Sequence, residues 1–307
     1  SGTKPEPMQV EILGVLRGAR GPGQDMILAR LKGAKPEYTG VVAGMSGSPV
    51  YIGTKLLGAL SYRIGQFAKD PIAGITPIAQ MLEVKNLPVS EQWASTAPAR
   101  VPSANSDSPN NPATVPASTM NFQAMETPLV MSGFHPEAVR LWQKQMAGTG
   151  LDLIAAGGGS GSSKSDSEGH FGAISPSAIA SVVPGSAVSA QLVRGDLEVS
   201  ATCTVTYVDP KQLLACGHPI LQAGTVSLPM TTAEVLETLA SPLNAFKIVN
   251  TGDSIGTFTE DRDSAIRGVL GVKPHMIPVH ITVHNQGTDR KLNIEVVDLP
   301  SLTPQAI

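Results

Sequence analysis

The most regular pattern of hydrophobic and polar positions in the chain lies between residues 197 and 207. From Leu197 to Tyr207 every second residue is apolar or cysteine, and the residues between them are Glu198, Ser200, Thr202, Thr204 and Thr206. A period of two is typical of a β-strand with one buried and one polar face. Residues 211–216 would return antiparallel after a turn at Asp209-Pro210, which predicts that Gly217-His218-Pro219 lies at a strand end.

Short apolar runs bounded by glycine predict further strands and hairpins. The segment 8–94 would hold strands at 10–16 and 26–31, followed by a hairpin at 49–52 and 56–62 that turns at 53–55. A last hairpin is predicted at 279–284 and 291–297, around Gln286-Gly287-Thr288. The chain is therefore expected to be mainly β.

Three short helices are predicted from capping signals. Thr76 would cap a helix that has Pro77 at its first position and ends at Val84. A second helix would span residues 136–147 and stop before Gly148. The capping-box spacing of Thr231-Thr232-Ala233-Glu234 predicts a third helix that runs to Leu239.

Composition divides the chain into two halves. Residues 95–118 are almost entirely Ser, Ala, Pro, Asn and Thr, and such a segment cannot bury enough apolar area to offset its ordering entropy. It is predicted to be a linker between a first half, residues 1–94, and a second half, residues 119–307. Another loop is predicted at 157–165, where Ser163 stands in place of the glycine that a phosphate-binding loop needs before its lysine.

Charge and hydropathy argue against two classes of function. The formal net charge is −3 and the 22 basic residues are scattered, whereas nucleic-acid binding requires clustered Lys and Arg. No apolar stretch approaches the roughly 20 residues of a membrane helix. Residues 1–4 lack the pattern of a signal peptide, so the expected export signal would have been removed upstream.

The two cysteines, Cys203 and Cys216, would face each other across the hairpin that turns at Asp209-Pro210. A disulfide at this place would fit an oxidising compartment. Two unbonded, buried cysteines would fit the same positions, because cysteine is often fully buried. The sequence leaves both alternatives open.

The segment Gly44-Met45-Ser46-Gly47-Ser48-Pro49 carries the strongest chemical signal in the chain. A serine hydroxyl becomes a nucleophile when a base removes its proton and the developing oxyanion is stabilised. Glycine two residues before Ser46 would let the N–H groups of Gly44 and Ser46 converge as an oxyanion hole. Gly47 would keep the space behind the nucleophile open. A glycine-serine turn with only a folding role is the alternative.

His218 is the strongest candidate for the base, because it is expected at a rigid, solvent-reachable strand end. His135 is expected to be a capping or surface residue at a helix start, and His170 falls in a loop. His280 and His284 would lie about 13 Å apart on one strand face, too far for a single metal ion with bonds of about 2 Å. No metal ion and no organic cofactor is expected.

At these residues the chain resembles the stage IV sporulation protein B family of serine peptidases. The motif 44–49 with the hairpin 53–62 is similar to that family's nucleophile region, and residues 204–209 leading to 217–220 are similar to its histidine segment. Residues 256–261 and 279–283 also resemble it. The resemblance implies a chymotrypsin-like double β-barrel, an exported location, Ser46 as nucleophile and His218 as base. In chymotrypsin-type enzymes the strand corresponding to Leu60, Ser61 and Tyr62 presents its edge to the substrate.

The chain departs from the family pattern in two respects. Ser46 precedes His218, the reverse of the family's order, which indicates a circular permutation. The place of the family's acidic residue falls near Leu31 and Lys32, which cannot orient an imidazole. The candidate replacements are Asp25, Asp253, Asp261 and Asp263. A Ser–His dyad with a backbone carbonyl on His218 is the alternative. The family's PDZ module is not evident.

The sequence therefore predicts a circularly permuted, chymotrypsin-like double β-barrel with a few short helices. The predicted function is an exported serine endopeptidase, periplasmic, extracellular or at the cell surface, that acts through an acyl-enzyme at Ser46. Its partners would be protein or peptide substrates, the chain itself among them. Two alternatives remain: a catalytically degenerate module that binds peptides by strand addition, and an extracellular structural domain.

Overall fold

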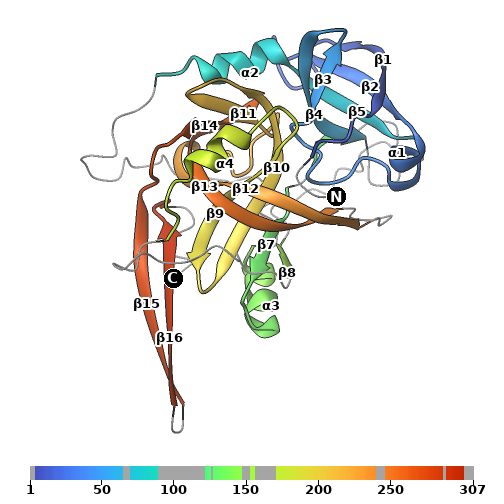
Figure 1. The fold of residues 1–307 in the computed structure, drawn as a ribbon. Coiled ribbons are helices and arrows are strands. Elements are labelled where there is room, and N and C mark those ends of the chain that lie inside the picture. The colour runs from blue at the N-terminus through green and yellow to red at the C-terminus, as the bar shows by residue number, and fades with distance from the viewer. Residues whose placement is uncertain are drawn as a thin grey trace, which may run out of the picture.

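The computed structural model describes residues 4–64, 70–88, 122–125, 127–146, 153–155, 171–239, 246–285 and 288–300. The protein is mainly β, and its strands form two sheets (Figure 1). The predicted linker at 95–118 and the predicted loop at 157–165 lie outside the described residues.

The first sheet contains the predicted strands of the N-terminal half. Its order is β1-β2-β5-β4-β3, and β6 pairs with β4 beyond the end of β3. The sheet buries one apolar cluster, which includes Leu31, Leu60 and Ile75. The strands are β1 (Gln9–Leu16), β2 (Met26–Lys32), β3 (Pro49–Ile52), β4 (Lys55–Ile64), β5 (Ile72–Pro77) and β6 (Phe122–Ala124). Thus β6 joins the first sheet although the sequence assigns its residues to the second half.

The second sheet closes on itself. Its order is β15-β16-β9-β12-β13-β14-β11-β10-β7-β8, and an additional pairing of β9 with β10 makes a ring of β9, β12, β13, β14, β11 and β10. The strands of the ring contribute many residues of the larger apolar cluster, among them Phe258 and Met230. Its strands are β9 (Ala187–Gly195), β10 (Glu198–Val208), β11 (Gln212–Ala215), β12 (Gly224–Leu239), β13 (Phe246–Arg262) and β14 (Ala265–Leu270).

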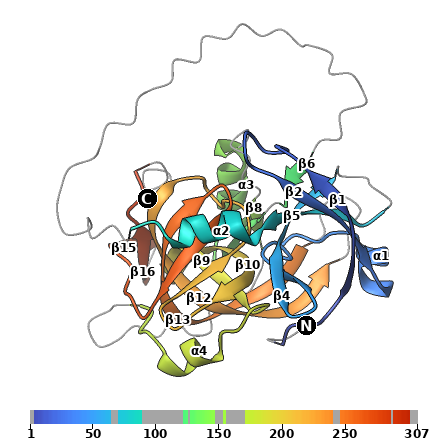
Figure 2. The same cartoon turned by 90° about the horizontal axis from the view of Figure 1, so that it is seen from above.

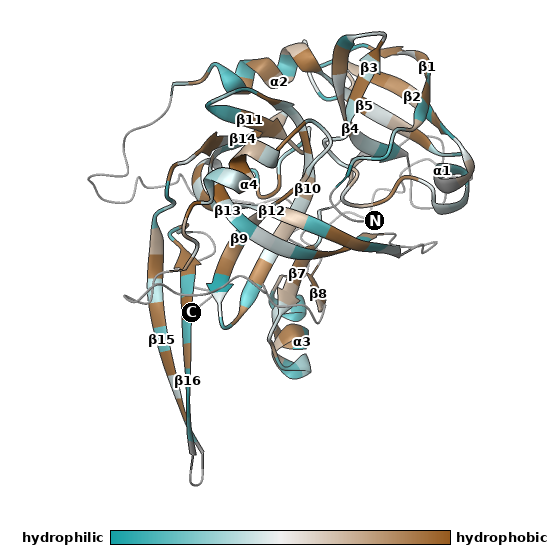
Figure 3. Cartoon of the chain, viewed as in Figure 1, coloured by the Kyte–Doolittle hydropathy of each residue, from teal (hydrophilic) through white to brown (hydrophobic). Residues whose placement is uncertain are grey.

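Two strand pairs extend the ring. β7 (Leu129–Ser132) pairs with β10, and β8 (Leu153–Ala155) pairs parallel to β7. The predicted last hairpin is confirmed as β15 (Met276–Asn285) and β16 (Thr288–Val297). This hairpin projects away from the ring, with alternating hydrophobic and hydrophilic bands along both strands (Figure 3).

Helix α2 (Ile78–Lys85) lies where the two sheets meet (Figure 2). Its Met81 and Val84 pack with Ala59 of the first sheet and with Leu214 of the second. Arg267 of β14 is fully buried and donates to three carbonyl groups at the end of this helix, those of Val84, Lys85 and Leu87. The other helices are α1 (Ala34–Thr39), α3 (Pro136–Gln145) and α4 (Pro176–Ser181).

Two of the predicted helices need correction. Residues 231–239 are part of β12, so the helix expected from the capping-box spacing is wrong. β12 pairs with β13 along its length and with β9 at residues 230–232, and these pairings override a four-residue local signal. The helix expected at Thr76 begins at Ile78 instead, because Thr76 belongs to β5 and its hydroxyl donates to the Gly217 carbonyl.

The polar face of β10 is not exposed to solvent, although its alternating pattern suggests a solvent-exposed face. Thr202, Thr204 and Thr206 are buried like the apolar residues between them. The reason lies in the tertiary structure, since Thr204 and Thr206 donate hydrogen bonds to the loop that contains Ser46.

Candidate functional site

The Ser46 turn is held against β10 by three hydrogen bonds. Thr204 N donates to Ser46 O at 2.8 Å and Thr204 Oγ1 donates to Gly44 O at 3.0 Å. Thr206 Oγ1 donates to Gly47 O at 2.7 Å. Two threonines of one strand thus bind three of the four residues from Gly44 to Gly47.

The two glycines of the turn have left-handed backbone conformations, with φ of +86° at Gly44 and +91° at Gly47. Gly47 also lies against backbone, because a Cβ atom there would be 1.9 Å from Thr204 O and 2.6 Å from Cys216 N. Gly47 N donates to Leu60 O at 2.8 Å, which ties the turn to β4. Glycine is therefore required at position 47 by conformation and by space.

The N–H groups of the turn divide into two sets. Met45 N donates to Val42 O, Gly47 N to Leu60 O and Ser48 N to Met45 O. Among the described residues, neither Gly44 N nor Ser46 N donates a backbone hydrogen bond, although Ala43 forms an isolated parallel bridge with Phe246 beside Gly44. These are the two groups that the sequence assigns to an oxyanion hole.

His218 is carried to the same region by the end of β11. Gly217 has φ of +74°, and a Cβ atom there would be 2.0 Å from Ser61 Oγ. Thr76 Oγ1 donates to Gly217 O at 2.7 Å, so the residue before the imidazole is anchored to the first sheet. The expected solvent-reachable position of His218 is wrong, because its side chain is only 2% exposed. It lies in the junction between the sheets.

A disulfide joins Cys203 of β10 to Cys216, two residues before His218. Of the two alternatives left open by the sequence, the bonded one is present. The bond links the strand that holds the Ser46 turn to the segment that holds the imidazole. Cys216 N also donates to Thr204 O at 3.2 Å, so both segments form backbone hydrogen bonds with Thr204.

Ser46 Oγ and His218 Nε2 are both buried and, among the described residues, neither has a hydrogen-bond partner. A buried polar atom without a partner costs about 1–3 kcal/mol. The hydroxyls of Thr127 and Thr231 share this property, so it does not identify a site by itself. Ser46 and His218 differ from these threonines because they lie on two segments that both form backbone hydrogen bonds with Thr204. An unpaired hydroxyl and an unpaired imidazole nitrogen are thus carried by neighbouring segments.

The environment of His218 favours the neutral imidazole. Its Nδ1 lies 2.7 Å from Pro219 O, which requires a proton on Nδ1 and leaves Nε2 as an acceptor. Burial lowers the pKa of His218 to about 4, the bond to Pro219 opposes this shift, and the positive charge of Arg20 adds to it. At neutral pH the imidazole is uncharged, with its free lone pair on Nε2.

Arg20 is a residue near the site that the sequence gives no reason to single out. It donates to Tyr62 Oη at 3.0 Å and to Asp263 O at 2.9 Å, and also to Gln80. It therefore joins the loop between β1 and β2 to residues of both sheets. Only the tertiary structure shows that its charge acts on His218.

Lys247 is a second such residue. Its ammonium group donates to Gly44 O at 2.8 Å, the carbonyl that Thr204 Oγ1 also binds. Burial lowers the pKa of Lys247 to about 8. A lysine near the start of an ordinary strand carries no sequence signal for this contact.

Among the described residues, none of the four candidate aspartates is hydrogen-bonded to the imidazole. Asp261 is buried and accepts from the N–H groups of Ile220 at 2.8 Å and Leu221 at 2.7 Å, so it shapes the loop after His218. Burial raises the pKa of Asp261, and these N–H bonds oppose the shift. Asp25 accepts from Gly18 N, Asp263 accepts from Gln222 Nε2, and Asp253 lies in a separate pocket.

The edge expected to receive substrate is already paired. Leu60 exchanges backbone bonds with Gly47 and Ser48, Ser61 O accepts from Met125 N at 2.8 Å, and Tyr62 lies opposite Ala124 of β6. The expectation of an open edge at Leu60, Ser61 and Tyr62 is therefore corrected, since a later segment of the same chain occupies it.

The other histidines have separate roles. His135 caps α3 as predicted, by accepting from Glu137 N. His280 bonds to Asn293 and His284 to Asp289 on the projecting hairpin, and His170 lies outside the described residues. The described residues contain no group of three or more His, Cys, Asp or Glu side chains arranged to bind a metal ion.

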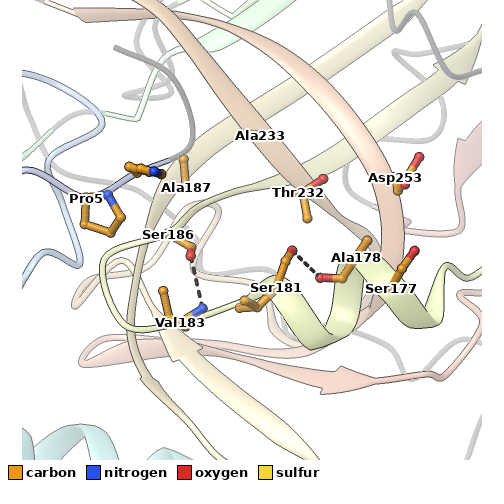
Figure 4. A pocket seen from close by; sticks show the side chains of 12 residues that line it. Pro5, Ser177, Ala178, Ser181, Val183, Ser186, Ala187, Thr232, Ala233 and Asp253 are labelled. Atoms are coloured by element: carbon orange, nitrogen blue, oxygen red, sulfur yellow. Dashed lines mark hydrogen bonds between the residues drawn. The ribbon is translucent and has the colours of Figure 1, made fainter.

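A pocket beside α4 holds Asp253 and several serines (Figure 4). Ser181 Oγ donates to Ala178 O, and Ser186 Oγ accepts from Val183 N. Neither Ser46 nor His218 lines this pocket. In the part of the chain that the structure describes, no helix combines the length and apolar character needed to cross a membrane.

With this geometry in hand, comparison with known proteins adds no relative: the chain matches no protein-family model, no curated protein and no solved structure.

Proposed function

We propose that the protein is a serine endopeptidase with Ser46 as nucleophile and His218 as general base. The observation that carries the proposal is the pair of open, buried atoms, Ser46 Oγ and His218 Nε2, on segments joined through Thr204 and Cys216. Buried polar atoms are normally satisfied, and exceptions call for an explanation such as catalysis. Catalytic hydrogen bonds are often long without substrate and shorten when it binds.

In the proposed reaction Ser46 Oγ bonds to the peptide carbonyl carbon while its proton passes to His218 Nε2. The N–H groups of Gly44 and Ser46 receive the oxyanion. His218 then gives its proton to the leaving nitrogen as the C–N bond breaks, and an acyl-enzyme remains. Water attacks the ester carbon while its proton passes to His218 Nε2. His218 then returns this proton to Ser46 Oγ as the ester C–O bond breaks and the carboxylic product leaves.

In this mechanism the Pro219 carbonyl replaces the acidic residue of a triad as the partner of His218 Nδ1. It accepts the Nδ1 proton and so selects the tautomer with a free Nε2. A carbonyl stabilises the imidazolium less than a carboxylate would, and burial also disfavours that charge. The proposed enzyme is accordingly slower than one with a complete triad. Asp261 acts only through the loop that it shapes.

The proposed enzyme would have a circularly permuted, chymotrypsin-like double β-barrel. The closed ring of the second sheet and the partly closed first sheet are compatible with two chymotrypsin-like barrels in permuted chain order. Triad geometry is independent of chain order in known peptidases. The Cys203–Cys216 disulfide favours an oxidising compartment and thus the proposed export.

A fluorophosphonate tests the proposal directly. The serine oxygen displaces fluoride at phosphorus, and the expected result is one added phosphonyl group on the peptide that contains Ser46. Ser46→Ala and His218→Ala should abolish labelling, whereas Ser48→Ala and His280→Gln are matched controls that should retain it. Labelling on another residue, or undiminished labelling of His218→Ala, would refute the assignment.

One observation favours a second candidate, a peptide-binding module without catalysis. The edge at Leu60–Tyr62 accepts an extended segment of this chain, and no carboxylate is bonded to His218. Strand addition needs only the backbone groups of such an edge. Peptide binding by a protein that no fluorophosphonate labels would support this candidate.

A further inference from the structure

The segment Phe122–Met125 lies where the substrate of the proposed enzyme would lie. β6 runs antiparallel to β4, with Phe122 opposite Ile64 and Ala124 opposite Tyr62. Met125 continues this register, because its N–H donates to Ser61 O at 2.8 Å. The segment is an extended strand added to the edge that the family resemblance assigns to substrate.

The nucleophile turn contacts this edge at the residue next to Ser61. Gly47 N donates to Leu60 O, one position before the carbonyl that accepts from Met125 N. Among the described residues of the segment, Met125 is therefore the one paired next to the contact between the turn and the edge. In the described part of the chain Ser61 N has no recorded bond to Met125 O. A reacting carbonyl must likewise be free of the edge strand to enter an oxyanion hole.

The side chain of Met125 occupies a closed apolar site. It is 1% exposed and belongs to the cluster with Leu60 and Val50, against which Met45 of the nucleophile turn also packs. The neighbouring Ala124 side chain is exposed. This alternation is the one by which strand addition gains specificity, since every second side chain enters a pocket.

We propose that Phe122–Met125 is an internal substrate mimic, and that the site takes extended peptides with methionine or another long, unbranched apolar residue before the bond to be cleaved. The preference for methionine at the cleaved bond rests on the proposed function. The occupation of the Leu60–Tyr62 edge by this segment does not. A branched or charged side chain would not fit a site shaped around Met125. The mimic also limits access to Ser46.

The size of this inhibition follows from effective concentration. A segment held in the same chain competes as though present at roughly millimolar concentration. Against a peptide of comparable intrinsic affinity, in the range of about 0.1 mM, displacing the mimic should strengthen apparent binding about tenfold. A strand with only a folding role would give the opposite result, a weaker and less stable site.

The test uses the full chain with Met125→Asp, which places a charge at the buried position, and Ala124→Asp as the matched control at the exposed position. Binding of the probe acetyl-Phe-Gln-Ala-Met-amide is measured in a Ser46→Ala background, so that catalysis is not needed. The expected result is about tenfold tighter binding with Met125→Asp and no change with Ala124→Asp. A probe ending in Asp should bind at least about tenfold more weakly.

The inference would be overturned if Met125→Asp bound the probe no more tightly than the protein that keeps Met125. If Met125→Asp unfolds, Met125→Ala, which only empties the pocket, is used with the same expected direction. Fluorophosphonate labelling of the Ser46 protein separates the two proposals. Tight probe binding without labelling removes the peptidase and leaves the mimic; labelling without tighter probe binding removes the mimic and leaves the peptidase.

Discussion

Replacement of Gly47 by alanine tests whether the Ser46 turn depends on its contact with β10. The added Cβ atom would meet Thr204 O at 1.9 Å and Cys216 N at 2.6 Å, and both are backbone atoms that cannot rotate away. Gly53, in the turn between β3 and β4, provides the control. It also has a positive φ, +59°, but a Cβ atom there meets nothing within 4 Å.

The two substitutions are expected to lower the unfolding free energy by different amounts. At Gly47 an added Cβ atom meets both an unfavourable φ and a clash with backbone, whereas at Gly53 it meets the unfavourable φ alone. Gly53→Ala should lower the unfolding free energy by about 1–2 kcal/mol, the cost of a left-handed conformation for a residue with a Cβ atom. Gly47→Ala adds overpacking against backbone, typically a further 1–3 kcal/mol, so a total of about 2–5 kcal/mol is expected. Urea denaturation of both variants gives the difference.

The same pair of variants also separates stability from reactivity. Gly47→Ala should slow fluorophosphonate labelling of Ser46, because relief of the clash moves the turn away from Thr204, whereas Gly53→Ala should label at the wild-type rate. Equal free energies of unfolding for the two variants would show that the turn is not held against β10. That result would refute the proposed site at Ser46 and His218.

Four further measurements address the site and the elements around it. Because burial lowers the pKa of His218 to about 4, labelling of Ser46 should stay constant from pH 8 to about 5 and halve near pH 4; a midpoint near 6.5 would contradict this. The unfolded imidazole binds its proton near pH 6.5, so about 3 kcal/mol of stability should be lost as pH falls from 6.5 to 4, and His218→Gln should lose that dependence in urea denaturation. Reduction of the Cys203–Cys216 bond, whose cysteines are 13 positions apart, should lower the unfolding free energy by about 3 kcal/mol, as should replacement of both cysteines by alanine; an unchanged melting temperature would exclude the bond. Arg267→Met leaves the three carbonyls at the end of α2 without their buried donor, while Glu260 keeps its ion pair with Arg262, and should cost about 3 kcal/mol; calorimetry showing a change below about 0.5 kcal/mol would contradict the capping role.

Local patterns in the sequence were sufficient to predict most strands. The two-residue period of 197–207, the hairpin after Pro49 and the last hairpin all predicted observed strands, because alternation and turn glycines act over a few residues. The helix expected at 231–239 failed, since long-range pairing with β9 and β13 outweighed its local capping signal.

By itself the sequence determined a mainly β protein with a glycine-framed serine and a histidine at a strand end. Only the tertiary structure decided that the threonines of β10 hold the serine turn, that Arg20 and Lys247 place charges beside the site, and that β6 covers the expected substrate edge. These contacts join residues separated by about 60 to 200 positions, as between Lys247 and Gly44, whose separation is 203. Hydrophobic periodicity reports which face of a strand is apolar, but it holds no information on which distant segment packs against the other face.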